Sequence, residues 1–130
     1  MREAEINVRT EQIVDAAMKV HSALGPGLLE SAYQACLAYE LRERGLRVQE
    51  QVGVPVKYRG VELDLAYRID LLVEGAVIVE LKAVAKTIPL FNAQLFSYLK
   101  LSGCPVGLLI NFHVDHLKDG IKRIVLNLEP

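Results

Sequence analysis

The sequence lacks several features that would place it in a specialised class of protein. It contains no tryptophan, only two cysteines, and no apolar run that approaches the roughly 20 residues of a membrane span. Its N-terminal stretch MREAEINVRTEQIV carries acids early and has no apolar segment of the kind found in secretory signals. We therefore expect a cytoplasmic protein with no membrane segment.

The sequence also has no excess of charge of one sign. Fifteen Lys and Arg residues balance 16 Asp and Glu residues, for a net charge of −1, which argues against a strongly basic nucleic-acid coat protein but allows a local basic face. Cys36 and Cys104 form no CxxC motif, and we interpret them as small buried side chains rather than as a disulfide or a zinc site. With 130 residues, of which 52% are hydrophobic, we expect one domain over residues 1–130.

The segment Gly25-Pro26-Gly27 separates two helical patterns. Thr10 is expected to cap the first helix, in which apolar residues recur at helical spacing up to Leu24. The second helix is expected over residues 28–44, with Gly45 just beyond its end.

A third helix and five strands are expected in the rest of the chain. Pro89 opens the helix and Ser102-Gly103 closes it. The strands are expected from alternating or continuous apolar residues at 46–56, 65–73, 76–81, 105–112 and 121–128, the last at a sheet edge, with a turn at Tyr58-Arg59-Gly60. The order α-α-β-β-β-α-β-β predicts an α/β or α+β fold, a mixed β-sheet with helices packed on it.

Three charged residues stand where a strand would be expected to carry apolar ones. Asp70 lies within one strand, and Glu80 and Lys82 follow an apolar run in the next and share a face. A two-residue turn at Glu74-Gly75 would set Asp70 opposite Val79, whereas an odd-numbered loop centred on Gly75 would set it opposite Glu80. We predict the odd loop, because it brings the two carboxylates together.

Such a group could support metal-dependent chemistry. Asp70, Glu80 and the backbone carbonyl of Leu81 suit Mg²⁺ or Mn²⁺, and Lys82 could orient or activate a water that attacks a phosphodiester. Two alternatives stay open. The charged residues could form an exposed cross-strand pair on a solvated face, or Lys82 could be bound to both acids in a structural cluster without metal.

Three helical residues could complete the site. Glu30 lies beside Leu37 and Leu41 on the helical wheel, so it is either a fourth member of an acidic site or a first-turn Glu favoured by the helix dipole. Gln94 and Tyr98 are one turn apart on the third helix and could line the same cleft, although a core Tyr and a hydrogen-bonded Gln explain them equally well.

Several segments match, in order, the pattern of a known family. They are Gly27-Leu28-Leu29-Glu30-Ser31-Ala32-Tyr33, Tyr67-Arg68-Ile69-Asp70, Ile78-Val79-Glu80-Leu81-Lys82-Ala83-Val84, Ala93-Gln94-Leu95 with Tyr98-Leu99, Gly107-Leu108-Leu109-Ile110-Asn111-Phe112, and Leu117-Lys118-Asp119-Gly120-Ile121-Lys122-Arg123. The chain resembles, from about Ile13 to Val125, the GxxExxY proteins of the PD-(D/E)XK nuclease-like superfamily.

The resemblance implies a restriction-endonuclease-like α/β core with Asp70, Glu80 and Lys82 as the nuclease triad and Glu30 as the acid carried by a helix. We therefore expect a Mg²⁺-dependent (or Mn²⁺-dependent) phosphodiesterase that acts on nucleic acid, with DNA favoured over RNA, and in which Gln94 and Tyr98 position the substrate or the triad. The alternative is a catalytically silent module of the same fold that binds nucleic acid or protein. Candidate phosphate contacts are scattered, and the near-neutral charge suggests that binding needs a homodimer or a partner protein. They are Lys57, Arg59, Arg68, Lys86 and Lys100.

Overall fold

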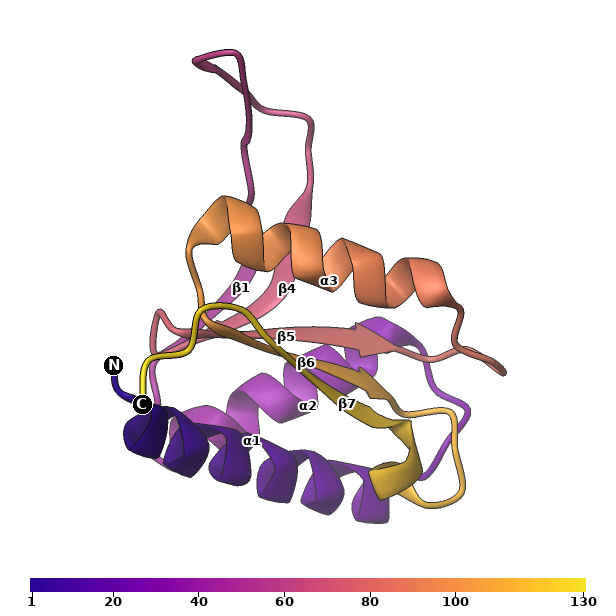
Figure 1. Cartoon of the computed structure of the whole chain (residues 1–130). Helices are drawn as coiled ribbons and strands as arrows, with labels where there is room; N and C mark the ends of the chain where they lie inside the picture. The colour runs from indigo at the N-terminus through magenta and orange to yellow at the C-terminus, as the bar shows by residue number, and fades with distance from the viewer.

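The computed structural model describes residues 1–130, in which a central sheet lies between helices (Figure 1). Helices α1 and α2 cover one face of the sheet, and α3 covers the other. In chain order the elements are α1 (Glu3–Leu24), α2 (Glu30–Glu43), β1 (Val48–Gly53), β2 (Val56–Tyr58), β3 (Val61–Leu63), β4 (Arg68–Val73), β5 (Val77–Lys82), α3 (Pro89–Ser102), β6 (Val106–Asn111), the 3₁₀ helix η1 (Leu117–Gly120) and β7 (Ile121–Val125).

The main sheet has five strands in the order β1-β4-β5-β6-β7. Strands β5 and β6 are parallel, and every other neighbouring pair in this sheet is antiparallel. A parallel pair needs a crossover connection, which α3 supplies. This mixed sheet with its three covering helices confirms the predicted fold class, and the predicted last strand lies at the sheet edge as β7.

Two apolar cores hold the layers together, and alternation along the strands assigns side chains to each. Leu81 and its odd-numbered neighbours on β5 pack against α1 and α2, whereas Ile78 packs on the α3 side. Gly107 allows α3 to lie close to β6, since a Cβ at this position would fall 2.6 Å from Cδ1 of Leu95. Cys104 is buried in the α3-side core, Cys36 is half-buried, and both are free thiols.

The expected order of elements was wrong between α2 and α3, where five strands are found instead of three. The additional elements come from a small hairpin, β2–β3, that forms its own two-stranded sheet. Pro55 cannot donate to a sheet ladder and separates β1 from β2. On the return, Ala66 adopts a φ of 61°, so β4 begins at Arg68 and not at residue 65.

The first helix begins earlier than expected, at Glu3, and Thr10 is therefore not its N-cap. Thr10 is buried within the helix, where its hydroxyl donates a hydrogen bond to the Asn7 carbonyl oxygen at 3.0 Å. Glu3 and Glu5 in the first turn favour helix formation through the helix dipole. No helix in the structure has both the length and the apolarity needed to cross a bilayer.

The turn between α1 and α2 depends on the tyrosine of the GxxExxY segment. The Tyr33 hydroxyl donates to the Gly25 carbonyl oxygen at 2.6 Å and accepts from the Leu28 N–H at 3.1 Å. The ring is buried and stacks on Phe112, with centroids 4.4 Å apart. Gly25 and Gly27 both have positive φ, 67° and 106°, a conformation that a side chain would strain. Tyr33 therefore fixes the point at which α2 starts.

Tyr33→Phe is expected to lower the free energy of unfolding by about 1–3 kcal/mol, because it leaves the Gly25 carbonyl and the Leu28 N–H without their partner while keeping the ring. Denaturant unfolding should show this loss, and Tyr39→Phe, on an exposed tyrosine of α2, should change stability by less than about 0.5 kcal/mol. Equal stability of Tyr33→Phe and the wild type would contradict the structural role of the hydroxyl.

Candidate active site

The candidate site lies where the ladder between β4 and β5 ends. The two strands pair from Val73–Val77 to Leu71–Val79, so the loop between them is Glu74-Gly75-Ala76 and Asp70 falls opposite Glu80. This confirms the predicted odd-numbered loop and register. Beyond Leu71 the strands are joined by side chains, because the Asp70 N–H donates to Glu80 Oε1 at 3.3 Å and the Leu81 N–H donates to Asp70 Oδ2 at 2.8 Å.

Strand alternation places the charged residues on the α3 side of the sheet. Ile78 packs in the α3-side core, so Glu80 and Lys82, two and four residues further on, face the same way. Glu80 is buried, with 7% of its surface exposed, whereas Asp70 and Lys82 are half-buried. Lys82 Nζ lies 4.5 Å from the ring centroid of Phe91 on α3, a cation–π contact that holds the ammonium beside the acids.

Gln51 on β1 supports Asp70 from the other side, a role that sequence reasoning missed. Its Nε2 donates to Asp70 Oδ1 at 3.3 Å and to Gln34 Oε1 on α2 at 2.7 Å. Gln51 has a φ of 52°, which costs a non-glycine residue on the order of 1–2 kcal/mol. A glutamine rarely adopts this left-handed backbone conformation by itself. The hydrogen bonds that Gln51 makes to Asp70 and Gln34 offset the strain.

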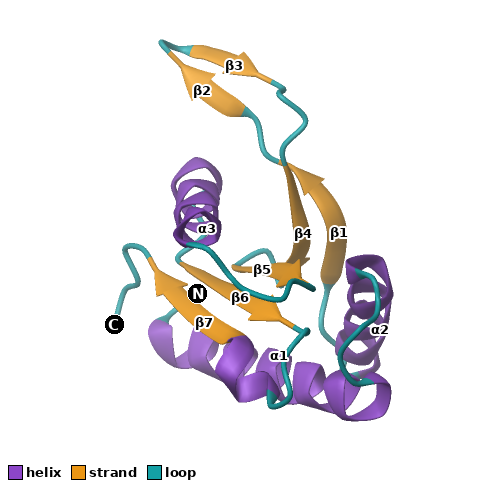
Figure 2. Ribbon diagram, turned by 90° about the vertical axis from the view of Figure 1, so that its right-hand side faces the viewer, coloured by secondary structure: helices purple, strands orange, loops and turns teal.

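The backbone twists sharply at this point. Leu71 belongs to the core under α1 and α2, and alternation would place Ile69 with it, yet Ile69 lies in the α3-side core. Strands β1 and β4 bend away from β5 beyond this point and lead into the β2–β3 hairpin (Figure 2). The twist explains why the regular ladder stops at Leu71 and why the Asp70 carboxylate, not a β4 carbonyl, accepts from the Leu81 N–H.

The electrostatics of the pair follow from burial and proximity. Burial, and then the negative charge of Asp70, raise the pKa of Glu80 from 4.5 to about 8, and the charge of Lys82 offsets only part of this. Burial and the nearby Glu80 carboxyl also raise the pKa of the Tyr98 phenol. At neutral pH the pair therefore holds a proton, because burial and mutual repulsion oppose the ionisation of both carboxyls.

The other predicted site residues are placed less centrally. Glu30 begins α2, is exposed and makes no hydrogen bond or ion pair. No group of three His, Cys, Asp or Glu side chains lies close enough together to hold a metal ion. One turn later on α2, Gln34 is linked to Asp70 only through Gln51, which donates to both side chains. Gln94 is exposed in a groove beside α3, and Tyr98 lies half-buried in the same groove, near enough to Glu80 and Asp70 to feel their charge.

The donor set fits a hydrated divalent cation. Mg²⁺ keeps several waters and needs only one or two carboxylates, which Asp70 and Glu80 provide as hard oxygen ligands. The N–H and carbonyl of one strand residue point to the same edge, so the carbonyl of Leu81, whose N–H donates to Asp70, also faces the acid pair. The sequence predicts this carbonyl as a third oxygen ligand, and its direction is compatible with that prediction.

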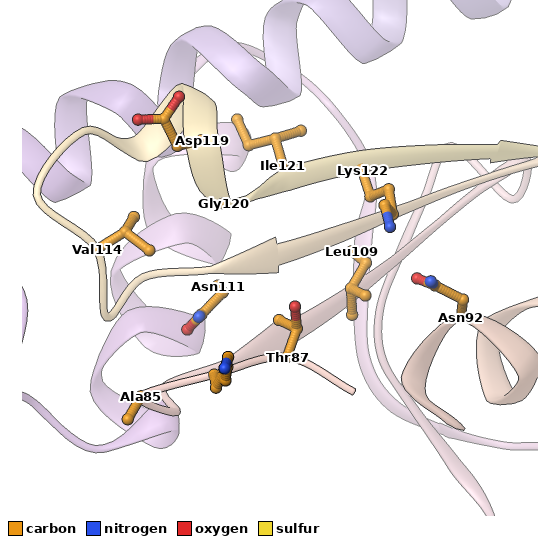
Figure 3. Close-up of a pocket in the computed structure, with 11 residues that line it drawn as sticks. Ala85, Thr87, Asn92, Leu109, Asn111, Val114, Asp119, Gly120, Ile121 and Lys122 are labelled. Carbon is orange, nitrogen blue, oxygen red and sulfur yellow. The ribbon is translucent and has the colours of Figure 1, made fainter. Parts of the chain in front are cut away.

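A pocket of about 230 Å³ opens beside the site, at the carboxyl ends of the parallel strands (Figure 3). Asn111 lines it and stands next to Lys82 in the register of β5 and β6. Lys122 and Asn92 turn their polar ends toward the space in front of Leu109 (Figure 3). Lys86, one of the expected phosphate contacts, also lines this pocket, together with one acid, Asp119. The other four expected contacts do not gather there.

Comparison with known proteins agrees with this geometry. A family model described as the PD-(D/E)XK nuclease superfamily matches residues 7–124. No curated protein and no solved structure matches the chain. The match includes Asp70, Glu80 and Lys82 and leaves the narrower resemblance to GxxExxY proteins as a prediction. Because it spans nearly all of the 130 residues, the chain belongs to the PD-(D/E)XK nuclease superfamily.

Proposed function

We propose that the protein is a nuclease that hydrolyses phosphodiester bonds of nucleic acid with Mg²⁺ or Mn²⁺, and that DNA is its favoured substrate. The observation that carries the proposal is the pairing of Asp70 and Glu80 across the end of the β4–β5 ladder, with Lys82 on the same face. Membership of the superfamily supports nuclease chemistry and a divalent cation.

In this proposal Asp70, Glu80 and the Leu81 carbonyl hold the cation. A bound divalent ion supplies charge neutralisation at the phosphate and lowers the pKa of water. Glu80 must lose its proton for this, because the neutral carboxyl is a poor ligand. Gln51 keeps the Asp70 carboxylate in place from β1, and Glu30 would add to the site from the helix side.

Lys82 has a separate task. Its ammonium, held against Phe91, would orient the attacking water or stabilise the negative charge that develops on the phosphate. The Tyr98 hydroxyl would position the substrate or the acids from α3. Lys86 and Lys122 would contact a phosphate next to the scissile one, since both line the adjoining pocket.

A cleavage screen tests the proposal. Duplex DNA, single-stranded DNA, branched DNA and RNA are incubated with Mg²⁺ or Mn²⁺, and products are resolved on denaturing gels. Metal-dependent cleavage of at least one substrate is expected, with DNA cut faster than RNA. A wild type inactive on all four with both metals would contradict the proposal and favour a silent binding module of the same fold.

Lys82→Ala is expected to lower the cleavage rate on the order of 10²-fold or more while leaving metal binding and the fold intact, because the variant removes only an electrostatic stabiliser. Asp70→Asn should abolish both cleavage and metal binding. Lys19→Ala is the control, since Lys19 is an exposed lysine of α1, on the face of the sheet opposite α3, and should be dispensable. Full activity of Lys82→Ala would remove Lys82 from the mechanism.

Metal binding is expected to release about one proton at pH 7, because the pKa of Glu80 stands at about 8 before the cation arrives. Affinity should therefore fall about tenfold per pH unit below pH 8. Calorimetry in buffers of different ionisation enthalpy measures both quantities, and Glu43→Gln, at an exposed position of α2, serves as the control. Binding that is independent of pH between 6 and 8 would show that Glu80 is not a ligand.

A further inference from the structure

The β2–β3 hairpin extends beyond the main sheet as an arm (Figure 2). We define the arm as residues 54–67. Its base is fixed, because the Val54 N–H donates to the Tyr67 carbonyl oxygen at 2.9 Å, and the Asp64 carboxylate accepts from the Ala66 N–H at 3.0 Å. Arg59 and Gly60, at φ values of 51° and 78°, form a two-residue turn of the type that matches the strand twist. The arm is thus a regular hairpin with a hydrogen-bonded base and a defined turn.

One face of the arm is wholly apolar. The register pairs Val56 with Leu63 and Tyr58 with Val61, and alternation places these four side chains on one face, while the charged pair Lys57–Glu62 occupies the other. Tyr58, Val61 and Leu63 are 64%, 55% and 40% exposed, so this face is largely uncovered apart from the half-buried Val56 at its base. A two-stranded hairpin is marginal in water unless its apolar face packs on something.

The apolar face continues into a groove on the outer side of α3. The groove, of about 380 Å³, lies between the base of the arm and the helix, and Val56 and Tyr67 line it from the arm. Leu90, Ala93 and Leu101 line it from α3, and Leu90 is 59% exposed. Arm and groove therefore form one continuous apolar surface.

We propose that this surface binds a second copy of the chain, with the arm of each copy lying in the groove of the other. Both complementary parts are present on one molecule, as a two-fold interface requires. The arm carries two cations, Lys57 and Arg59, and two acids, Glu62 and Asp64, so its charge is zero. That balance favours self-association over nucleic acid, whose phosphates attract a positive surface. Gln94, which also lines the groove, is then a contact of the dimer.

The available area agrees with a stable dimer. The exposed parts of Tyr58, Val61, Leu63, Tyr67 and Leu90 offer roughly 500 Å², given that one exposed aromatic side chain presents on the order of 200 Å². A standard interface buries about 800 Å² per partner, of which somewhat more than half is apolar. The surface is thus about the size that one partner of a specific dimer contributes.

Sedimentation velocity of the full chain over a range of concentrations tests the proposal. The wild type is expected to be a dimer at about 10 µM, and Val61→Glu on the arm and Leu90→Lys in the groove should each raise the dimer dissociation constant at least about tenfold. Circular dichroism and calorimetric Mg²⁺ binding should stay unchanged and show that both variants fold. Lys57→Ser, on the charged face of the arm, is the matched control and should remain dimeric.

A mixture of the two variants tests the exchange of arms. In a heterodimer the arm of the Val61→Glu copy would lie in the groove of the Leu90→Lys copy, where the two introduced charges attract, and the other arm–groove contact would be wild type. An equimolar mixture should therefore regain the dimer that neither variant forms alone.

Three results would overturn the proposal: a wild type that stays monomeric at about 100 µM, a dimer unaffected by either variant, or no recovery of the dimer on mixing. Loss of DNA binding by a monomeric Val61→Glu, with a monomeric wild type, would assign the arm to nucleic acid instead.

Discussion

The structure depends on how two backbone N–H groups are satisfied where the β4–β5 ladder stops. Past Leu71 the strands separate, and the Leu81 N–H loses the β4 carbonyl that a continued ladder would supply. The Asp70 N–H, which alternation directs toward β1, lies where the β1–β4 pairing is interrupted at Gln51. The carboxylates of Glu80 and Asp70 accept from these two N–H groups instead. Unpaired N–H groups at this depth would cost about 1–3 kcal/mol each, so the acids are needed by the fold as well as by the proposed chemistry.

This arrangement brings two carboxyl groups together in a partly dry place, and the neighbouring side chains reduce the repulsion between them only in part. Lys82 and the Gln51 amide lie close enough to oppose the repulsion, yet the pKa of Glu80 still stands at about 8. Because this value lies above the ordinary 4.5, ionisation of Glu80 opposes folding: its contribution to stability is complete below pH 4.5 and is lost as the pH rises through 8. With a divalent cation bound, ionisation of Glu80 would instead favour folding, since the cation binds the ionised carboxylates.

The sequence was sufficient for the features governed by local rules. The register at Gly75 followed from the need to bring Asp70 and Glu80 together, and α3 was bounded correctly by Pro89 and Gly103. It could not show the arm, because apolar alternation at residues 54–63 looks the same whether a strand joins the main sheet or leaves it. Nor could it show Gln51, whose left-handed backbone contradicts local preference and is imposed by its surroundings. The wheel position of Glu30 indicated a face of α2 but not its distance from the acids.

The most direct test of this account is an NMR titration of the Glu80 side-chain carboxyl carbon in the metal-free protein, repeated in Asp70→Asn. We expect a pKa of about 8 in the wild type, and a lower value in the variant, because the neutral amide removes the negative charge opposite Glu80. A wild-type pKa near 4.5, or one unchanged by Asp70→Asn, would show that the two carboxyls do not share a buried site.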